Sequence, residues 1–247
     1  LRDRPMQPSH TIYPVLTPTP EATPLRRHAL PVGSGHVIAV QEWGCADGIA
    51  AVVLHGGPGS GSSPLLRRGF DLSRYRVISI DQRGAGASTP RGGVEDNTLD
   101  DLLDDLRHVR EALGVHQWLV VGGSWGATLA VVHAAAEPQA VSALLLRSAF
   151  LARHEDIDWF FQGAAAEQPQ AWQRLASIAQ QDERGALLPC LQRMLREGTA
   201  AQQQQAALAW WQWEQALAGT AASPPSQDNM PALIDRYRVQ SHYLAHG

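Results

Sequence analysis

The 247-residue sequence is 44% apolar, which is enough to bury a sizeable core. Its 20 basic and 24 acidic residues give a formal net charge of −4, which excludes the strongly basic surfaces that bind nucleic acid or anionic membranes. No segment approaches the roughly 18 consecutive apolar residues of a membrane span, and two cysteines, Cys45 and Cys190, do not make a disulfide framework. These features favour a globular, cytoplasmic protein and imply neither a metal nor an organic cofactor; the oligomeric state is not indicated.

Residues 1–30 are expected to form an extended arm, because prolines recur through the first 24 residues without apolar periodicity. From residue 31 to residue 150 the pattern changes to short apolar runs separated by helical segments. The runs predict strands at 36–43, 50–54, 76–80, 118–121 and 143–146, and the spacing of apolar residues predicts helices over 98–113 and 127–137. Strands buried on both faces that alternate with helices predict an α/β core with a mostly parallel sheet.

Residues 151–247 contain no further strand pattern and are predicted to form a helical cap subdomain. The expected helices span 159–166, 170–181, 187–196, 200–218 and 231–245. A helical block that follows an α/β block suggests a cap above the sheet.

The strongest chemical signal is the segment Gly122-Gly123-Ser124-Trp125-Gly126, which has a buried strand before it and a helix after it. In a G-x-S-x-G pattern of this kind the serine occupies a tight strand-to-helix turn, with its hydroxyl exposed at the carboxyl end of the sheet. Ser124 is therefore the expected catalytic nucleophile.

The glycine-rich segment His55-Gly56-Gly57-Pro58-Gly59 follows the first buried strand, and no G-K-[S/T] sequence follows it, which argues against a phosphate loop. We interpret it as one half of an oxyanion hole, in which the backbone N–H groups of Gly57 and Trp125 stabilise the tetrahedral intermediate. His55 itself is interpreted as a structural residue. In the next glycine-rich turn, Asp81 and Arg83 are interpreted as buttresses.

These three glycine-rich segments, in this order and spacing, resemble the proline iminopeptidase family of α/β-hydrolases, and the similarity extends from about residue 30 to 247. The resemblance implies an α/β-hydrolase core with a helical cap. It also implies a serine peptidase that releases an N-terminal residue, proline or another small one, from a small peptide with a free N-terminus. The reaction would pass through an acyl-enzyme on Ser124.

One face of the predicted helix 200–218 carries Trp210, Trp213 and Leu217 together with Glu214. A buried carboxylate needs a partner, so Glu214 forms either a salt bridge to an arginine or a counter-charge for a substrate ammonium. The family resemblance favours the second role. It also implies a second glutamate at a position that is Gln240 here, so the preference for N-terminal proline is open.

A serine nucleophile needs a base and an orienting acid. None of His133, His154, His242 and His246 follows a buried-strand pattern, and Asp156 and Asp158 are weak candidates for the acid. The resemblance implies that both partners lie on later strands of the core, so we expect that part of the core to follow Gly247 and residues 1–247 to be inactive by themselves. An esterase or amidase, and a non-catalytic binding protein of the same fold, remain as alternatives.

Overall fold

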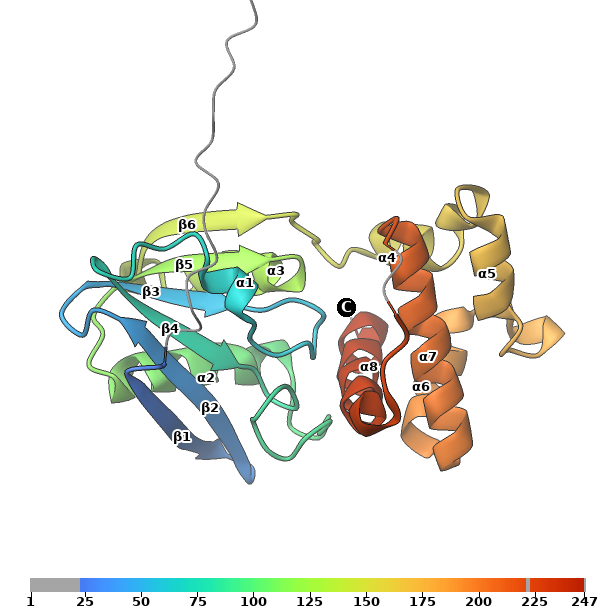
Figure 1. Cartoon of the computed structure of the whole chain (residues 1–247), viewed down its shortest axis with the longest axis horizontal. Coiled ribbons are helices and arrows are strands. Elements are labelled where there is room, and N and C mark those ends of the chain that lie inside the picture. Colours follow the sequence, from blue (N-terminus) through green and yellow to red (C-terminus); the bar gives the residue numbers. More distant parts are fainter. Residues whose placement is uncertain (1–22, 221–222, 247) are drawn as a thin grey trace, which may run out of the picture.

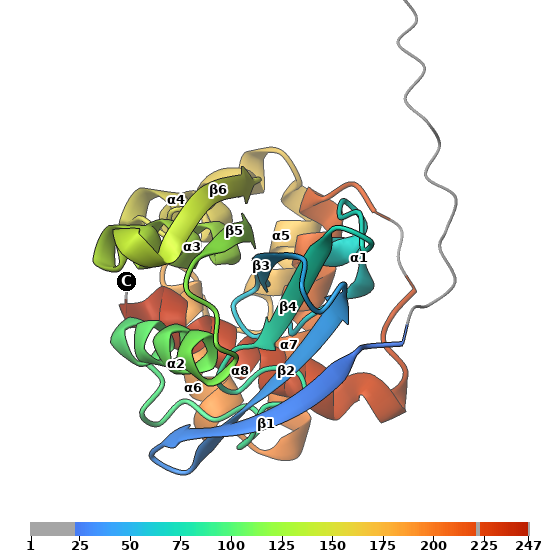
Figure 2. The ribbon, with the colours of Figure 1, turned by 90° about the vertical axis from the view of Figure 1, so that its left-hand side faces the viewer.

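The computed structural model of the chain describes residues 23–220 and 223–246. Within this part, one mixed sheet has the strand order β1-β2-β4-β3-β5-β6 (Figures 1 and 2). β2 runs antiparallel to both of its neighbours, and the other neighbouring pairs are parallel. The strands are β1 (Arg26–Gly33), β2 (His36–Gly44), β3 (Ile49–Leu54), β4 (Tyr75–Asp81), β5 (Trp118–Gly123) and β6 (Val141–Arg147).

The helices of the core are α1 (Pro64–Arg67), α2 (Leu99–Ala112) and α3 (Trp125–Ala136), followed by a 3-10 turn, η1 (Pro138–Ala140). α2 and α3 lie on the same face of the sheet (Figure 2). Apolar side chains of the central strands, such as Ile78 and Leu54, pack there against Leu106 and Leu129 of the two helices. α2 begins with a capping box, in which the Asp101 N–H donates to Thr98 Oγ1 and the Thr98 N–H donates to the Asp101 carboxylate.

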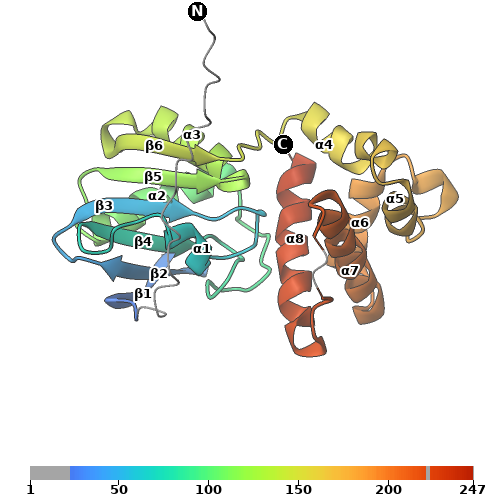
Figure 3. The same cartoon turned by 45° about the horizontal axis from the view of Figure 1, so that its top comes forward.

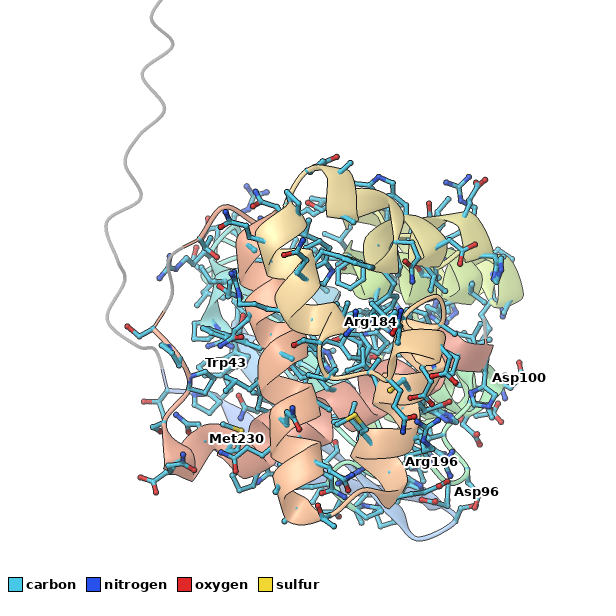
Figure 4. All side chains as sticks on the ribbon, turned by 90° about the vertical axis from the view of Figure 1, so that its right-hand side faces the viewer. Trp43, Asp96, Asp100, Arg184, Arg196 and Met230 are labelled. Atoms are coloured by element: carbon cyan, nitrogen blue, oxygen red, sulfur yellow. The ribbon has the colours of Figure 1, made fainter. Side chains whose placement is uncertain are left out.

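The cap is a separate helical layer beside the carboxyl ends of the parallel strands (Figure 1). Its helices are α4 (His154–Phe161), α5 (Pro169–Ala176), α6 (Leu187–Glu197), α7 (Ala200–Leu217) and α8 (Met230–His246), with 3-10 turns η2 (Gly163–Ala166), η3 (Gln181–Glu183) and η4 (Gln227–Asn229). The outer face of the cap carries solvent-exposed side chains such as Arg184 and Arg196 (Figure 4).

Helix α8 lies between the sheet and the rest of the cap (Figure 3). Leu233 and Tyr237 belong to the apolar cluster of the cap, whereas Val239 and Tyr243 belong to the apolar cluster beneath the sheet. α8 therefore fixes the cap on the core.

The predicted α/β architecture is confirmed, but the expected arm is too long. Residues 1–22 lie outside the described residues, and β1 begins at Arg26, so residues 26–30 form a strand and not an arm. β1 is an edge strand that buries little of its surface, and it therefore lacks the apolar pattern that predicted the other strands.

Two predicted cap helices also have different bounds. Gly163 ends the helix expected over 159–166, so that α4 occupies 154–161 and a 3-10 turn follows. The helix expected over 170–181 ends at Ala176, where the chain tightens into 3-10 hydrogen bonds from Ile178 to Leu175 and from Ala179 to Ala176.

The last strand, β6, pairs with β5 and has no second neighbour among the described residues. Leu144, Leu145 and Leu146 are each at least 40% exposed there. Over the same described ranges, no helix is both long and apolar enough to cross a membrane.

Candidate active site

Ser124 lies between the end of β5 and the first residue of α3, with φ 54° and ψ −124°. This left-handed backbone conformation is rare for a residue with a side chain and is typical of a nucleophile elbow. The flanking glycines make the turn sterically possible, because a Cβ on Gly122 would lie 2.1 Å from the Gly126 carbonyl oxygen and one on Gly126 would lie 2.2 Å from the Leu54 carbonyl oxygen. The side chain of Ser124 is exposed to solvent.

The expected oxyanion loop lies directly beside this serine, because β3 and β5 are neighbours and Leu54 is opposite Gly122. A Cβ built on Gly56 would lie 3.1 Å from Ser124 Cβ and 3.7 Å from its Oγ. Gly57 has φ 113°, a backbone conformation that glycine adopts more readily than residues with a Cβ. Among the described residues the N–H groups of Gly57 and Trp125 have no hydrogen-bond acceptor, so both are free to bind an oxyanion.

Asp81 and His55 hold this loop in place. The two oxygens of Asp81 accept hydrogen bonds from the Ser62 N–H at 2.6 Å and the Ala87 N–H at 2.9 Å, which ties two glycine-rich turns together. His55 Nε2 accepts the Gln82 N–H at 3.0 Å, so its Nδ1 carries the proton and donates to the Gly56 carbonyl at 2.9 Å. Both ring nitrogens are thus engaged in the loop, which fits a structural role and not that of a base.

Burial lowers the pKa of His55 below its ordinary value of 6.5, so the unfolded chain takes up this proton at a higher pH than the folded one. The free energy of unfolding is therefore expected to fall as the pH drops below about 6.5. In His55→Gln, whose side-chain oxygen still accepts the Gln82 N–H, this fall should be smaller. Urea unfolding between about pH 7.5 and 5.5 measures it, and an equal fall in both proteins would contradict the role of His55.

Arg83 connects the second glycine-rich turn to α2. Its guanidinium donates to both oxygens of Asp105 at 2.7 and 2.9 Å, and both side chains are about 95% buried or more. It also donates to the Asp96 carbonyl and lies 3.3 Å from the Asp101 carboxylate. Desolvation raises the pKa of Asp105 even though Arg83 opposes this shift.

The residue Asn97 joins this part of the core to α8. Its side-chain amide donates to the Gly93 carbonyl at 2.7 Å, and its side-chain oxygen accepts the Tyr243 hydroxyl at 2.5 Å. The His242 ring donates to the Asn97 carbonyl at 2.9 Å. Burial lowers the pKa of His242 and raises that of Tyr243, so both remain neutral donors at pH 7.

A cavity of about 810 Å³ lies between core and cap, and Ser124 is one of the residues that line it. The core contributes the oxyanion loop and Arg147. The cap contributes an apolar wall, formed by Ile157, Phe160, Phe161, Leu217 and Leu244. It also contributes a polar group, formed by Glu214, Arg236 and Gln240. Of the residues that the sequence indicated for the nucleophile, the oxyanion hole and substrate binding, Ser124, Gly57, Glu214 and Gln240 line this cavity, and Trp125 follows Ser124 as the first residue of α3.

Glu214 is held by three donors from α8. Its Oε2 accepts from Arg236 Nη2 at 2.8 Å and from the Tyr237 hydroxyl at 2.9 Å, and its Oε1 accepts from Gln240 Nε2 at 2.9 Å. The salt bridge that the sequence left open as one of two alternatives is present. Burial raises the pKa of Tyr237, and the nearby Glu214 carboxylate raises it further, so the hydroxyl keeps its proton.

Arg236 was not predicted from the sequence. It lies one helical turn before Gln240 on α8, and residues four apart share a helix face. Because the sequence analysis had already assigned Gln240 to substrate binding, this spacing could have placed Arg236 at the same site.

The four histidines that follow Ser124 are engaged elsewhere. His133 accepts from the Trp118 indole at 3.1 Å, and the His154 side chain is 93% exposed and lies 3.5 Å from Asp158. His242 contacts Asn97, and His246 bonds to the His242 carbonyl.

The candidate acid Asp156 forms a surface ion pair with Arg153 at the start of α4. None of the histidines in the described segments bonds to the Ser124 hydroxyl, and these segments hold no cluster of three or more metal-ligating side chains.

The fold and the exposed serine define the class of protein: the chain is an α/β-hydrolase. A family model described as the alpha/beta hydrolase fold matches residues 51–236. Among solved structures, a proline iminopeptidase-related protein from Thermus thermophilus covers 85% of this chain with a TM-score of 0.50 and 26% identity, and 70% of that protein is covered. The proline iminopeptidase of Mycobacterium smegmatis, at 21% identity, shares the fold with a TM-score of 0.53, over 85% of this chain and 69% of that one.

More closely similar sequences identify the family. A proline iminopeptidase of Arabidopsis thaliana is 40% identical over 223 residues, which are 87% of this chain and 58% of that protein. One of Xylella fastidiosa is 37% identical over 232 residues, 92% of this chain and 74% of that protein. The chain therefore belongs to the proline iminopeptidase family, and it spans between about three fifths and three quarters of the length of these two relatives.

Proposed function

We propose that this chain carries the nucleophile, the oxyanion hole and the cap of a serine hydrolase that releases an N-terminal residue, proline or another small one, from small peptides. The observation that carries the proposal is the exposed Ser124, held in a left-handed turn beside the free N–H groups of Gly57 and Trp125 and facing the cavity under the cap. The names of the relatives support a prolyl substrate. We expect the protein to act on peptides in the cytoplasm.

In the proposed reaction, Ser124 Oγ attacks the carbonyl carbon of the N-terminal residue while a base removes its proton. The carbonyl oxygen becomes an oxyanion that accepts hydrogen bonds from the N–H groups of Trp125 and Gly57. When the intermediate collapses, the C–N bond breaks and the shortened peptide leaves with the proton. Water then hydrolyses the acyl-enzyme and restores Ser124.

We propose that residues outside the described part of the chain supply the base and its orienting acid, since each histidine after Ser124 in that part is engaged elsewhere. Residues 1–247 by themselves are therefore expected to hydrolyse proline p-nitroanilide about a million times more slowly than a complete triad enzyme. Release of p-nitroaniline measures this rate. Turnover by the purified 247-residue chain at a normal enzymatic rate, abolished in its Ser124→Ala variant, would contradict the expectation.

Glu214 and Gln240 are proposed to bind the nitrogen end of the substrate. In Glu214→Ala, Arg236 loses its ion-pair partner and faces that nitrogen unopposed. The value of kcat/KM for proline p-nitroanilide is expected to fall by about 10- to 100-fold, the range for a lost hydrogen bond to a charged group. For p-nitrophenyl acetate, which has no amine, we expect a much smaller change. Equal losses on both substrates, measured with the complete gene product, would favour an esterase.

The proposed function is tested with the complete gene product on three substrates: proline p-nitroanilide, its N-acetylated form and p-nitrophenyl acetate. Hydrolysis of at least one prolyl arylamide through a stoichiometric acyl-enzyme on Ser124 supports it. Hydrolysis of the ester only would indicate an esterase. Hydrolysis of none, without labelling by a fluorophosphonate, would indicate a binding protein of this fold.

A further inference from the structure

The cavity extends from the cap over Ser124 to the segment that follows the oxyanion loop. All of residues 60–66 except Pro64 line it. The proposed function places the terminal nitrogen of the substrate at Glu214 and Gln240 in the cap, so the peptide that leaves must run in another direction from Ser124. Residues 60–66 belong to the core, and the proposed function gives them no role so far.

This segment is held close to the strand that ends at Ser124. Ser62 donates from its hydroxyl to the Ile80 carbonyl at 3.1 Å and from its N–H to Asp81 at 2.6 Å, which fixes it at the end of β4. In the sheet, β3 lies between β4 and β5. Two strand spacings of about 4.8 Å put Ser62 about 10 Å from the line of β5. About three residues of extended peptide cover that distance, so the segment flanks the residue that follows the cleaved bond.

Helix α1 holds Leu65 at the cavity on a fixed support. The helix lies on the face of the sheet opposite to α2 and α3 (Figure 2). Leu66 packs there in the small apolar cluster around Trp43, and the Arg67 guanidinium lies 3.6 Å from the centre of the Trp43 ring. Leu65 itself is 60% exposed, more than any other large apolar side chain in the described part of the chain. Its two neighbours therefore anchor the helix, while Leu65 offers an apolar surface to the cavity.

The part of the cavity around Leu65 carries no charge, since residues 60–66 include no ionisable side chain. Among the described residues, the charged side chains of the lining are Glu214 and Arg236, which pair with each other at 2.8 Å, and Arg147. Arg147 ends β6, which lies on the other side of β5 from β3 and β4. An apolar side chain gains by leaving water at such a surface, whereas a charged one loses hydration without gaining a partner.

We infer that Leu65 forms an apolar subsite for the second residue of the substrate, the one that follows the cleaved bond, so that this hydrolase prefers peptides with a large apolar second residue such as leucine. The inference rests on the proposed function, which sets the direction of the bound peptide. Leu65 acts as a specificity residue and takes no part in bond breaking. Because the shortened peptide leaves when the acyl-enzyme forms, the subsite affects acylation and not the later hydrolysis.

The test uses the complete gene product and three amides with the same N-terminal proline: prolyl-leucinamide, prolyl-serinamide and prolinamide, which has no second residue. The release of proline measures all three reactions. The unchanged protein should have a kcat/KM about tenfold higher for prolyl-leucinamide than for prolyl-serinamide. In Leu65→Ser, kcat/KM for prolyl-leucinamide should fall about five- to tenfold. The value for prolinamide should change little, because this substrate does not reach the subsite.

A second variant and a control make the test specific. Leu65→Arg places a positive charge at the subsite, so it should shift the preference from a leucine toward an aspartate as the second residue. The rate at which the prolyl acyl-enzyme is hydrolysed should be the same in both variants, since the acyl group is the same. The matched control is Leu25→Ser, because the Leu25 side chain is 49% exposed and is not among the residues that line the described cavity.

Equal kcat/KM values of the unchanged protein for the leucine and serine peptides would overturn the inference. So would a loss in Leu65→Ser that is as large for prolinamide, or a slower hydrolysis of the acyl-enzyme, because either result would mean that the catalytic centre itself is disturbed. These outcomes leave the proposed function intact. Hydrolysis of no prolyl substrate by the complete gene product would instead overturn the proposed function, and this inference with it.

Discussion

Replacement of Ser124 by alanine in the complete gene product is expected to lower kcat for prolyl arylamide hydrolysis by about a million-fold, because the acyl-enzyme can no longer form. The substitution removes one oxygen from a solvent-exposed side chain, so the free energy of unfolding should fall little. Alanine at φ 54° is strained to a similar degree as serine, so the turn itself is retained. Initial rates and urea unfolding of the same preparations measure the two effects.

The control is Ser177→Ala at the exposed end of α5, where the Ser177 hydroxyl donates to the Arg174 carbonyl of the same helix. It should keep the activity of the unchanged protein. If Ser124→Ala retained more than about a hundredth of the rate, the reaction would not pass through this serine. In triad enzymes, the rate that remains after a triad residue is removed is lower than the intact enzyme's rate by several orders of magnitude.

Among the substitutions proposed here, replacement of Arg83 by methionine is expected to cause the largest loss in the free energy of unfolding. The change leaves Asp105, whose side chain is 5% exposed, without its bidentate partner, and removes the donor to the Asp96 carbonyl. Breaking a buried pair on one side typically costs about 3–5 kcal/mol of unfolding free energy. The loss should be largest near pH 7 and shrink as the pH falls, because burial already raises the pKa of Asp105 and protonation then removes the uncompensated charge. Chemical unfolding at several pH values measures both.

Two further variants make this prediction specific. Arg153→Met removes an ion pair that is exposed on the surface and should leave the free energy of unfolding nearly unchanged. The double variant Arg83→Met/Asp105→Leu removes both charges and should recover part of the loss. A double variant as unstable as the single one would show that packing of the Arg83 side chain, and not the buried charge, determines the effect.

The sequence was sufficient to predict those elements of the fold that are determined by residues close to one another in the chain. The apolar runs of β3, β4 and β5 are buried on both faces, so each could be recognised without knowledge of its neighbours. The turn at Ser124 could also be predicted, because the crowding that requires Gly122 and Gly126 arises within a few residues of the serine and from the adjoining strand.

What could not be predicted depends on contacts between distant segments. β1 became a strand only through its pairing with β2, and α8 could be assigned as a helix but not as the element that packs on both core and cap. The partner of Glu214 lies 22 residues further along the chain, on another helix, so the sequence showed that a partner was needed without showing which one.

The central claim is that Ser124 is a nucleophile that faces the amides of Gly57 and Trp125. A crystal structure of the complete gene product after reaction with a fluorophosphonate tests it most directly. We predict a phosphonyl group bonded to Ser124 Oγ, with its oxygen about 2.7–3.1 Å from the backbone nitrogens of Gly57 and Trp125. An adduct on a different residue, or a phosphonyl oxygen turned away from both nitrogens, would contradict this account.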